Sequence, residues 1–221
     1  MRYKAVLFDV DGTLLDTSEG IVKSVEETIE HFKLKTMPHE ELMRFIGPPI
    51  EWSFEGKCGV PKENLAEVAA YFRDRYSNHN LLGAEVYDGV YEFLDFLRDS
   101  GIAIGIATYK KQDYAEKLLR HFHFDDYTDV IYGSDYEGKL RKADIIDLCI
   151  EKLSEGRQKV LMVGDSSHDA KGADLAGVDF AGVSFGFGFG RFGGEDINDF
   201  KHVIYADRMT DLKSLFEGGQ I

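Results

Sequence analysis

Six short, continuous apolar runs separate segments of helical periodicity along the chain. The runs occupy 5–8, 102–107, 130–132, 160–163, 180–183 and 203–205. Because their apolar residues are continuous rather than alternating, they are typical of strands buried on both faces of a parallel sheet. Between them, apolar residues recur at helical spacing, as at Val90, Phe93, Leu94 and Leu97. This alternation of strands and helices predicts a doubly wound α/β fold with a parallel sheet.

The connection between the first two predicted strands is too long for a simple crossover. The ends of these strands are 99 residues apart, whereas a strand–helix–strand unit needs roughly 30. The surplus contains two further helical patterns, at 21–32 and 65–72. We therefore expect a small helical domain over 16–82, inserted into an α/β core formed by 1–15 and 83–221.

Charge and composition exclude several classes of partner. The 221 residues include 26 Lys and Arg against 40 Asp and Glu, a formal net charge of −14. Nucleic acids and anionic membranes need clustered basic residues, and no apolar run is long enough to span a bilayer. Cys58 and Cys149 lack CxxC spacing, and the first residues do not resemble a signal peptide. We expect free thiols and a cytoplasmic protein with no nucleic-acid or membrane partner.

Polar residues follow three of the predicted strands. Asp9 and Asp11 follow the first strand, Thr108 ends the second, and Asp165 and Asp169 follow the run at 160–163. In an open α/β sheet, ligands bind at the edge where the strands end. In an extended chain, residues two apart point to one side, which would bring Asp9 and Asp11 together. A helix would place Asp165 and Asp169 on one face.

Up to four carboxylates in one place require a positive partner. Two anions about 4 Å apart repel by roughly 4 kcal/mol at an effective dielectric constant near 20. Ligands that are all oxygen favour Mg²⁺ first and Mn²⁺ second, and Mg²⁺ held by few carboxylates is the usual partner of a phosphate group. Taken alone, Asp169 could be a helix N-cap and Thr108 a turn hydroxyl. The ordered combination instead indicates a metal-dependent phosphate site.

Several segments resemble the haloacid dehalogenase (HAD) superfamily over essentially the whole chain. The sequence Asp-Val-Asp-Gly-Thr-Leu-Leu-Asp at 9–16 resembles the first motif of this family. Thr108 resembles the second motif, Lys142 the third, and the segment 164–169 the fourth. The helical insertion resembles the family's cap, and 45–50 is similar to the cap loop of phosphoglycolate-phosphatase-like members. The resemblance implies a Rossmann-like core with a helical cap.

The resemblance also implies catalytic roles. Asp9 would be the nucleophile that forms an aspartyl-phosphate. Asp11 would protonate the leaving oxygen and then activate water. Thr108 and Lys142 would hold the phosphoryl oxygens. A residue such as Asp11 separates phosphoryl-transfer members from dehalogenases, so it argues against carbon–halogen chemistry.

The metal site follows from the same resemblance. Mg²⁺ would be bound by the carboxylate of Asp9, the backbone carbonyl of Asp11 and the carboxylate of Asp165. Asp169 would be either a direct ligand or a residue that orients the ligands.

Other residues are candidates for substrate contact. Gly12 permits a turn directly after Asp11, and Tyr109 stands where the family often has a small residue before Lys-Pro. Arg44 could reach a substrate from the cap, although a solvated helix charge explains it equally well. Lys139 competes with Lys142 for the third-motif role, and we favour Lys142 because it directly precedes a helical pattern.

A glycine-rich stretch occurs late in the chain. The segment 188–193 matches GxGxxG, but no second strand–helix–strand half follows it, so we do not expect a dinucleotide site. We expect 182–194 to be a flexible loop near the site, with Phe185, Phe187 and Phe189 packing either in the core or under the cap.

The first functional hypothesis is a Mg²⁺-dependent phosphatase, monomeric or homodimeric, acting on a small phosphorylated metabolite. The second is phosphoryl transfer within a substrate, as in related phosphoglucomutases. The third is a non-hydrolysing phospho-acceptor like a receiver domain, although receiver domains are shorter and need neither a cap nor a partner such as Asp11.

Overall fold

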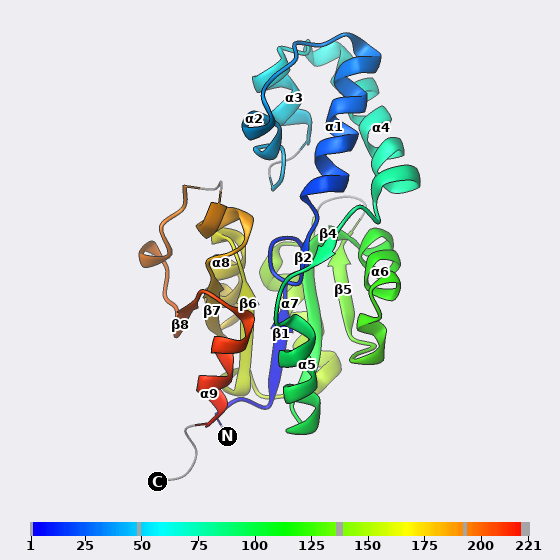
Figure 1. Ribbon diagram of the computed structural model, residues 1–221. Coiled ribbons are helices and arrows are strands. Elements are labelled where there is room, and N and C mark those ends of the chain that lie inside the picture. The colour runs from blue at the N-terminus through cyan, green and yellow to red at the C-terminus, as the bar shows by residue number, and fades with distance from the viewer. Residues whose placement is uncertain (1, 48–49, 136–138, 192–193, 218–221) are drawn as a thin grey trace. The chain divides into compact units, whose positions relative to one another are not determined.

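The computed structural model describes residues 2–47, 50–135, 139–191 and 194–217. The chain divides into two compact units, each described here by itself (Figure 1). The larger comprises Met1–Asp16 with Val86–Ile221, and the smaller is Thr17–Glu85, whereas the sequence prediction sets the insertion at 16–82. Where the chain passes between the units, β2 (Leu15–Asp16) and β3 (Glu85–Val86) form a two-stranded sheet.

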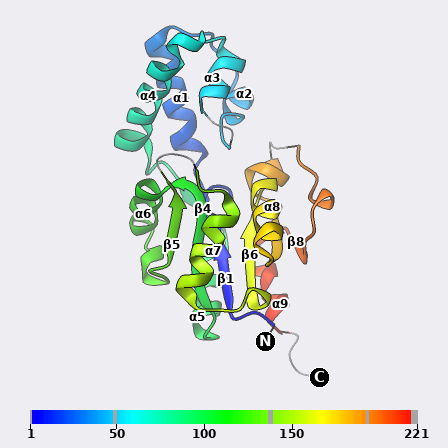
Figure 2. The ribbon, with the colours of Figure 1, turned by 180° about the vertical axis from the view of Figure 1, so that it is seen from behind.

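The larger unit contains a six-stranded sheet in the order β5-β4-β1-β6-β7-β8, and every neighbouring pair is parallel. Its strands are β1 (Ala5–Phe8), β4 (Ala103–Lys111), β5 (Ile131–Ser134), β6 (Val160–Gly164), β7 (Asp179–Val183) and β8 (Ile204–Ala206). Its helices are α5 (Val90–Asp99), α6 (Gln112–His121), α7 (Lys142–Leu153), α8 (Ser167–Ala176) and α9 (Ser214–Glu217). Helices α5 and α9 lie on one face of the sheet, and α7 and α8 on the other (Figures 1 and 2). The predicted doubly wound parallel sheet is confirmed.

The strand register brings the ends of three strands to one edge. Phe8, the last residue of β1, pairs in register with Ile106 of β4 and Val163 of β6. The chain order runs outward from β1 through β4 and β5 on one side, and through β6, β7 and β8 on the other. The switch point therefore lies between β1 and β6, where open α/β sheets bind their ligands.

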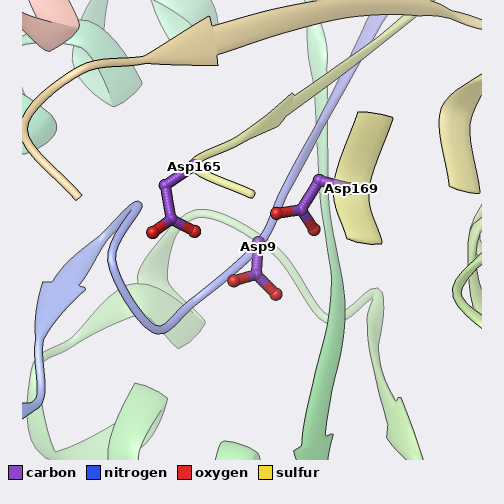
Figure 3. A group of neighbouring side chains, drawn as sticks. All are labelled: Asp9, Asp165 and Asp169. Carbon is purple, nitrogen blue, oxygen red and sulfur yellow. The ribbon is translucent and has the colours of Figure 1, made fainter. Parts of the chain in front are cut away.

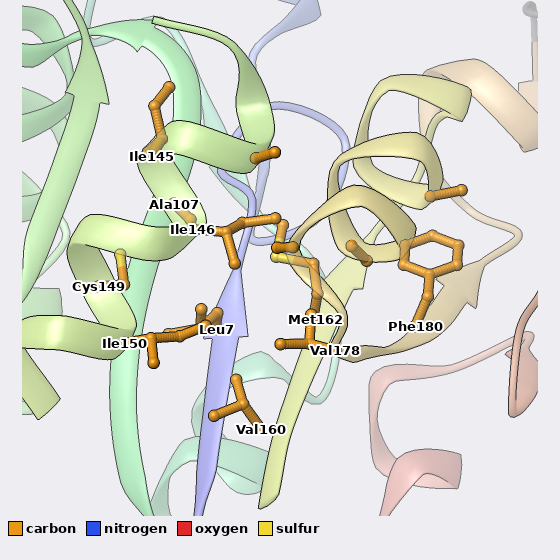
Figure 4. Close-up of a cluster of buried hydrophobic side chains, with 14 of the residues drawn as sticks. Leu7, Ala107, Ile145, Ile146, Cys149, Ile150, Val160, Met162, Val178 and Phe180 are labelled. Atoms are coloured by element: carbon orange, nitrogen blue, oxygen red, sulfur yellow. The ribbon is translucent and has the colours of Figure 1, made fainter. Parts of the chain in front are cut away.

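Both faces of the central strands are buried, which explains their continuous apolar sequence. Leu7 belongs to a core cluster with Ile146 of α7 and Met162 of β6 (Figure 4). The next residue, Phe8, faces the other side, where its ring centre lies 6.1 Å from that of Phe93 in α5. Each such side chain contributes about 1.5–3 kcal/mol on burial.

The two cysteines are free thiols. Cys149 is buried in the core cluster and lies 3.2 Å from the Ile106 carbonyl oxygen. Burial raises the pKa of the Cys149 thiol to about 12, so this sulfur is unreactive at neutral pH. Cys58 is half-buried.

The smaller unit is helical, as predicted for a cap. It contains α1 (Ser18–Phe32), α2 (His39–Met43), α3 (Ile50–Cys58) and α4 (Leu65–Arg75), followed by a short π-helix at Tyr76–Asn80. A row of aromatic rings links its parts: Phe54 contacts Phe45 and Phe72, and Phe72 stacks on Tyr76. Pro48 and Pro49 of the predicted cap loop lie outside the described residues. Among the helices described, none combines the length and apolarity that crossing a membrane requires.

Candidate active site

Asp9 lies at the end of β1, at the switch point of the sheet. Its backbone N–H donates to the Val163 carbonyl at 3.0 Å, which fixes it against the end of β6. Its side chain is buried, and one carboxylate oxygen accepts a hydrogen bond of 2.6 Å from Lys142 Nζ. A buried carboxylate held by a buried ammonium is oriented in a single direction.

Three carboxylates gather at this point. One oxygen from each of Asp9, Asp165 and Asp169 lies within 4.8 Å of the others, and all three residues are buried (Figure 3). Asp9 follows β1, Asp165 follows β6, and Asp169 lies in the first turn of α8. The predicted convergence of Asp9 with Asp165 and Asp169 is therefore present in the geometry.

The reason that Asp165 and Asp169 meet differs from the one expected. Helix α8 begins at Ser167, so Asp165 precedes the helix and does not share a helical face with Asp169. The turn into the helix brings the two residues together. Asp169 Oδ2 accepts bonds from Ser166 N–H at 3.2 Å and Ser166 Oγ at 2.7 Å. Asp169 is thus the third residue of a capping box, rather than an N-cap.

Lys142 bridges two of the carboxylates. It is the first residue of α7, and its Nζ lies 2.6 Å from both Asp9 Oδ1 and Asp169 Oδ1. Burial disfavours the charged ammonium, but Asp169 and Asp9 outweigh burial and raise the Lys142 pKa above its ordinary value. Lys142 therefore stays protonated at neutral pH.

The electrostatics fit a divalent cation bound at the carboxylate cluster. Burial raises the pKa of Asp9 to about 6, although Lys142 opposes the rise. Burial, with the charges of Asp169 and Asp9, raises the pKa of Asp165 well above its ordinary value. Burial is the largest cause of both shifts, and the three carboxylates together carry more negative charge than the Lys142 ammonium neutralises. Buried carboxylate oxygens with excess negative charge are the donors that a hard cation such as Mg²⁺ takes.

Asp11 has a different partner from Asp9. Its carboxylate lies 2.7 Å from Lys110 Nζ, and the cluster of three carboxylates does not include it. Strand β1 ends at Phe8, and Asp9 and Asp11 bind different lysines. After burial, the charge of Asp11 is among the causes that raise the Asp9 pKa. The expectation that both side chains point to one side stays a prediction. The sequence prediction for Asp11 as a ligand concerned its backbone carbonyl.

Sequence reasoning missed the contact between Lys110 and Asp11. A signal was present, because Thr108 and Lys110 are two residues apart in β4 and residues at this spacing share one side of a strand. The buried Thr108 hydroxyl oxygen accepts a 3.1 Å bond from the Lys110 N–H.

Tyr109 holds the start of α7. Its hydroxyl oxygen accepts a 2.8 Å bond from the Lys142 N–H, and its ring centre lies 5.6 Å from Lys142 Nζ. Lys139 is placed otherwise, with its backbone N–H donating to Asp135 at 2.8 Å. This placement favours Lys142 over Lys139 as the lysine beside Asp9.

Gly12 lies where a side chain would not fit. Its φ is +81°, and a Cβ there would lie 2.2 Å from Asp165 Oδ2. Arg44 belongs to the smaller unit, where its exposed guanidinium lies 3.2 Å from the Glu41 carboxylate.

The stretch predicted as a flexible loop at 182–194 is partly ordered into elements. Strand β7 extends to Val183, and Phe187–Arg191 form a π-helical turn with a kink at Gly190. Phe189 packs in the core, with ring centres 6.2 Å from Phe180 and 5.8 Å from Phe200. Two residues of the GxGxxG match, at 192 and 193, lie outside the described part of the chain.

Comparisons with known proteins agree with this geometry. Residues 6–183 match the family described as "Haloacid dehalogenase-like hydrolase". A "5'-nucleotidase" of Pseudomonas aeruginosa is 34% identical to this chain in sequence, and the match covers 98% of this chain and 97% of that protein. "Pyrophosphatase PpaX" of Halalkalibacterium halodurans is also 34% identical, covering 80% of this chain and 81% of its own.

A solved structure, that of Protein Tyrosine Kinase A (PtkA) of Mycobacterium tuberculosis, has a TM-score of 0.82. It is 28% identical in sequence, with 98% of this chain and 99% of that chain covered. The fold and site define a Rossmann-like hydrolase. The chain belongs to the haloacid dehalogenase-like hydrolase family, and the resemblance seen in its motifs is confirmed.

Proposed function

We propose that this hydrolase is a Mg²⁺-dependent phosphatase that acts on a small phosphomonoester through a phosphorylated Asp9. One observation carries the proposal. The buried Asp9 carboxylate lies at the switch point with Lys142 Nζ at 2.6 Å, and Asp165 and Asp169 complete the cluster. A nucleophile, a cation and a metal-binding set in one place are the parts that phosphoryl transfer requires.

Asp9 and Asp165 would hold Mg²⁺ together with the Asp11 backbone carbonyl that the family resemblance implies. Asp169 is engaged by Ser166 and Lys142, which favours an orienting role for it over direct ligation. When bound, Mg²⁺ would offset the negative charge of the phosphoryl group.

The first half of the reaction transfers the phosphoryl group to Asp9. A carboxylate oxygen of Asp9 forms a bond to phosphorus while the bond from phosphorus to the ester oxygen breaks. Asp11 gives its proton to the departing oxygen, so the product leaves as an alcohol. Lys142 keeps the Asp9 carboxylate oriented and offsets charge on the phosphoryl oxygens, and Thr108 offers its hydroxyl to them.

The second half releases phosphate. A water oxygen forms a bond to phosphorus, Asp11 takes the water proton, and the bond between phosphorus and Asp9 breaks. Inorganic phosphate and the free Asp9 carboxylate result, and Asp11 is protonated again for the next turnover.

The substrate class is a soluble phosphate, and the relatives suggest which to test first. Those named 5'-nucleotidase and pyrophosphatase favour nucleoside 5'-monophosphates and pyrophosphate, alongside sugar phosphates and phosphoglycolate. The test is phosphate release from this panel with Mg²⁺, for the natural chain and for Asp9→Asn. We expect turnover in the natural chain and its loss in Asp9→Asn, which keeps the shape of the side chain.

Each alternative function predicts a different result in this assay. Phosphate moved within a sugar without release would favour a phosphomutase, and a stable phosphorylated Asp9 without turnover would favour a phospho-acceptor. Transfer from ATP to a protein tyrosine would favour the activity for which PtkA is named. Substantial phosphate release by Asp9→Asn would refute Asp9 as the nucleophile.

A further inference from the structure

The segment that follows β7 contacts the residue that follows β6. The backbone N–H groups of Phe187 and Gly188 donate to Asp165 Oδ2 at 2.6 and 3.1 Å. The N–H of Phe189 donates to the Asp165 carbonyl oxygen at 2.8 Å. Asp165 is therefore held through both its side chain and its backbone.

This close approach explains two glycines of the segment, Gly186 and Gly188, the second of which begins the stretch that matches GxGxxG. A Cβ on Gly186 would lie 2.3 Å from Asp165 Cβ and 2.3 Å from the Gly12 carbonyl oxygen. A Cβ on Gly188 would lie 2.7 Å from the Asp165 carbonyl oxygen. These glycines bring backbone donors to a carboxylate of the protein itself.

The same segment makes a second contact farther along, through Glu195. Glu195 Oε2 accepts a 2.7 Å bond from the Ser167 N–H, and Oε1 accepts a 2.6 Å bond from the Ser167 hydroxyl. Ser167 is buried and is the first residue of α8. The first N–H groups of a helix have no partner within the helix, and its N-terminus favours an anion. A carboxylate with both oxygens bound there fixes the start of α8 firmly.

Ser167 lies midway between Asp165 and Asp169, two residues from each. Because Asp165 precedes the helix, the turn at 166–167 decides whether the two carboxylates converge. We propose that Glu195 is a positioning residue for the metal site, acting through Ser167 on Asp165 and Asp169. The proposal rests on the Mg²⁺ site of the proposed function. Glu195 lies beyond the part of the chain that matches the family, 6–183.

The test is Mg²⁺ binding to the EDTA-stripped protein, measured by calorimetry, with the ion-free melting temperature recorded in parallel. Glu195→Ala should raise the Mg²⁺ dissociation constant by about tenfold or more, the usual cost of losing a group that orients metal ligands. Glu195→Gln should raise it less, since the amide can still accept from the Ser167 N–H and donate to its hydroxyl oxygen.

Asp196→Asn is the matched control. It removes one negative charge from the neighbouring position, and Asp196 Oδ1 accepts locally from the backbone and side chain of Asn198. We expect its Mg²⁺ affinity to equal that of the natural chain. An equal loss of affinity in Asp196→Asn and Glu195→Ala would overturn the positioning role, because it would show a general charge effect.

The outcomes separate the two proposals. If the natural chain binds no Mg²⁺, the proposed function fails and this inference fails with it. If the natural chain binds Mg²⁺ and Glu195→Ala binds it equally well, with a lower melting temperature alone, only the positioning role is refuted. Should Glu195→Ala not fold, Ser167→Ala removes the hydroxyl contact alone, and unchanged affinity in that variant overturns the inference.

Discussion

The Lys110 ammonium lies 2.7 Å from the Asp11 carboxylate and joins the ends of two neighbouring strands. The Lys110 side chain is nearly buried, with 5% of its surface exposed, whereas the Asp11 side chain is 24% exposed. The partner that orients Asp11 is thus shielded from water, while Asp11 itself is accessible to a reactant. Lys110 thus fixes the direction of the Asp11 side chain and leaves it within reach of a substrate and of water, as the proton transfers proposed for Asp11 require.

We expect Lys110→Met to impair the proton transfer assigned to Asp11. General acid catalysis contributes about 10²–10⁴-fold, and it matters most when the leaving group is a poor one. Hydrolysis of alkyl phosphates should therefore fall much further than hydrolysis of p-nitrophenyl phosphate, whose leaving group departs without a proton. Steady-state kinetics on both substrates measure the ratio of alkyl phosphate hydrolysis to p-nitrophenyl phosphate hydrolysis.

Two variants serve as controls for Lys110→Met. Lys110→Arg keeps a cation beside Asp11, so its ratio of the two activities should stay close to that of the natural chain. Lys111→Met alters the next lysine, whose ammonium lies 5.9 Å from the Tyr114 ring centre, and should leave the ratio unchanged. An equal fall on both substrates in Lys110→Met would show that Lys110 does not act through Asp11.

Lys142→Met should destabilise the ion-free protein at neutral pH. It leaves Asp9 and Asp169 buried without the ammonium that pairs with both, and breaking a buried pair in this way costs about 3–5 kcal/mol. Urea denaturation with and without Mg²⁺ measures the effect, and Mg²⁺ should recover part of the loss. Lys139→Met should change stability and activity little. The reverse ranking of the two variants would assign the role to Lys139.

The pH dependence of the ion-free protein should reveal the buried carboxylates. Burial raises the Asp9 pKa from 3.8 to about 6 in the folded chain, so between these values the folded state binds more protons than the unfolded state. The resulting stabilisation is fully present below pH 3.8 and is lost as the pH rises through 6. At 1.36 kcal/mol per unit, Asp9 alone contributes about 3 kcal/mol. Asp165, whose pKa is also raised, acts in the same direction.

The comparison with Asp9→Asn isolates this contribution. Carboxylates with lowered pKa values, such as Glu27 and Asp144, act in the opposite direction in both proteins. The difference in unfolding free energy between the natural chain and Asp9→Asn should therefore decline as the pH rises from 4 to 7 in EDTA. A difference that stays constant over this range would contradict the raised Asp9 pKa.

The parallel sheet could be predicted because burial on both faces leaves a direct mark on the sequence. Leu7 and Phe8 are adjacent and face opposite layers, so both must be apolar. The positions of Asp9 and Asp165 follow from the same pattern, because parallel strands end at one edge of the sheet.

Contacts that depend on register and on loop paths could not be predicted in this way. Asp11 and Lys110 are 99 residues apart along the chain, and their pairing depends on the alignment of β1 with β4. Glu195 reaches Ser167 from 28 residues away through a segment without periodicity. Such contacts are set by the packed structure, and the local pattern of residue types does not indicate them.

The fit between Gly12 and Asp165 gives a further prediction, on Gly12→Ala. The alanine Cβ would lie 2.2 Å from Asp165 Oδ2, and φ of +81° is unfavourable for a residue with a side chain. The backbone strain costs about 1–2 kcal/mol, and Asp165 must move from the position in which Phe187 holds it. Gly12→Ala should therefore weaken Mg²⁺ binding as well as lower the melting temperature.

Gly156→Ala separates the loss of a glycine from the loss of this fit. Gly156 has a φ of −74°, and its nearest neighbour to an added Cβ is the Gln158 side chain at 3.7 Å. An alanine there fits, so Mg²⁺ affinity should be unchanged and stability equal or up to about 1 kcal/mol higher. Calorimetric titration of both variants tests the difference. If Gly12→Ala binds Mg²⁺ as tightly as Gly156→Ala, the position of Asp165 does not govern metal binding, because a ligand displaced by a methyl group must lose affinity.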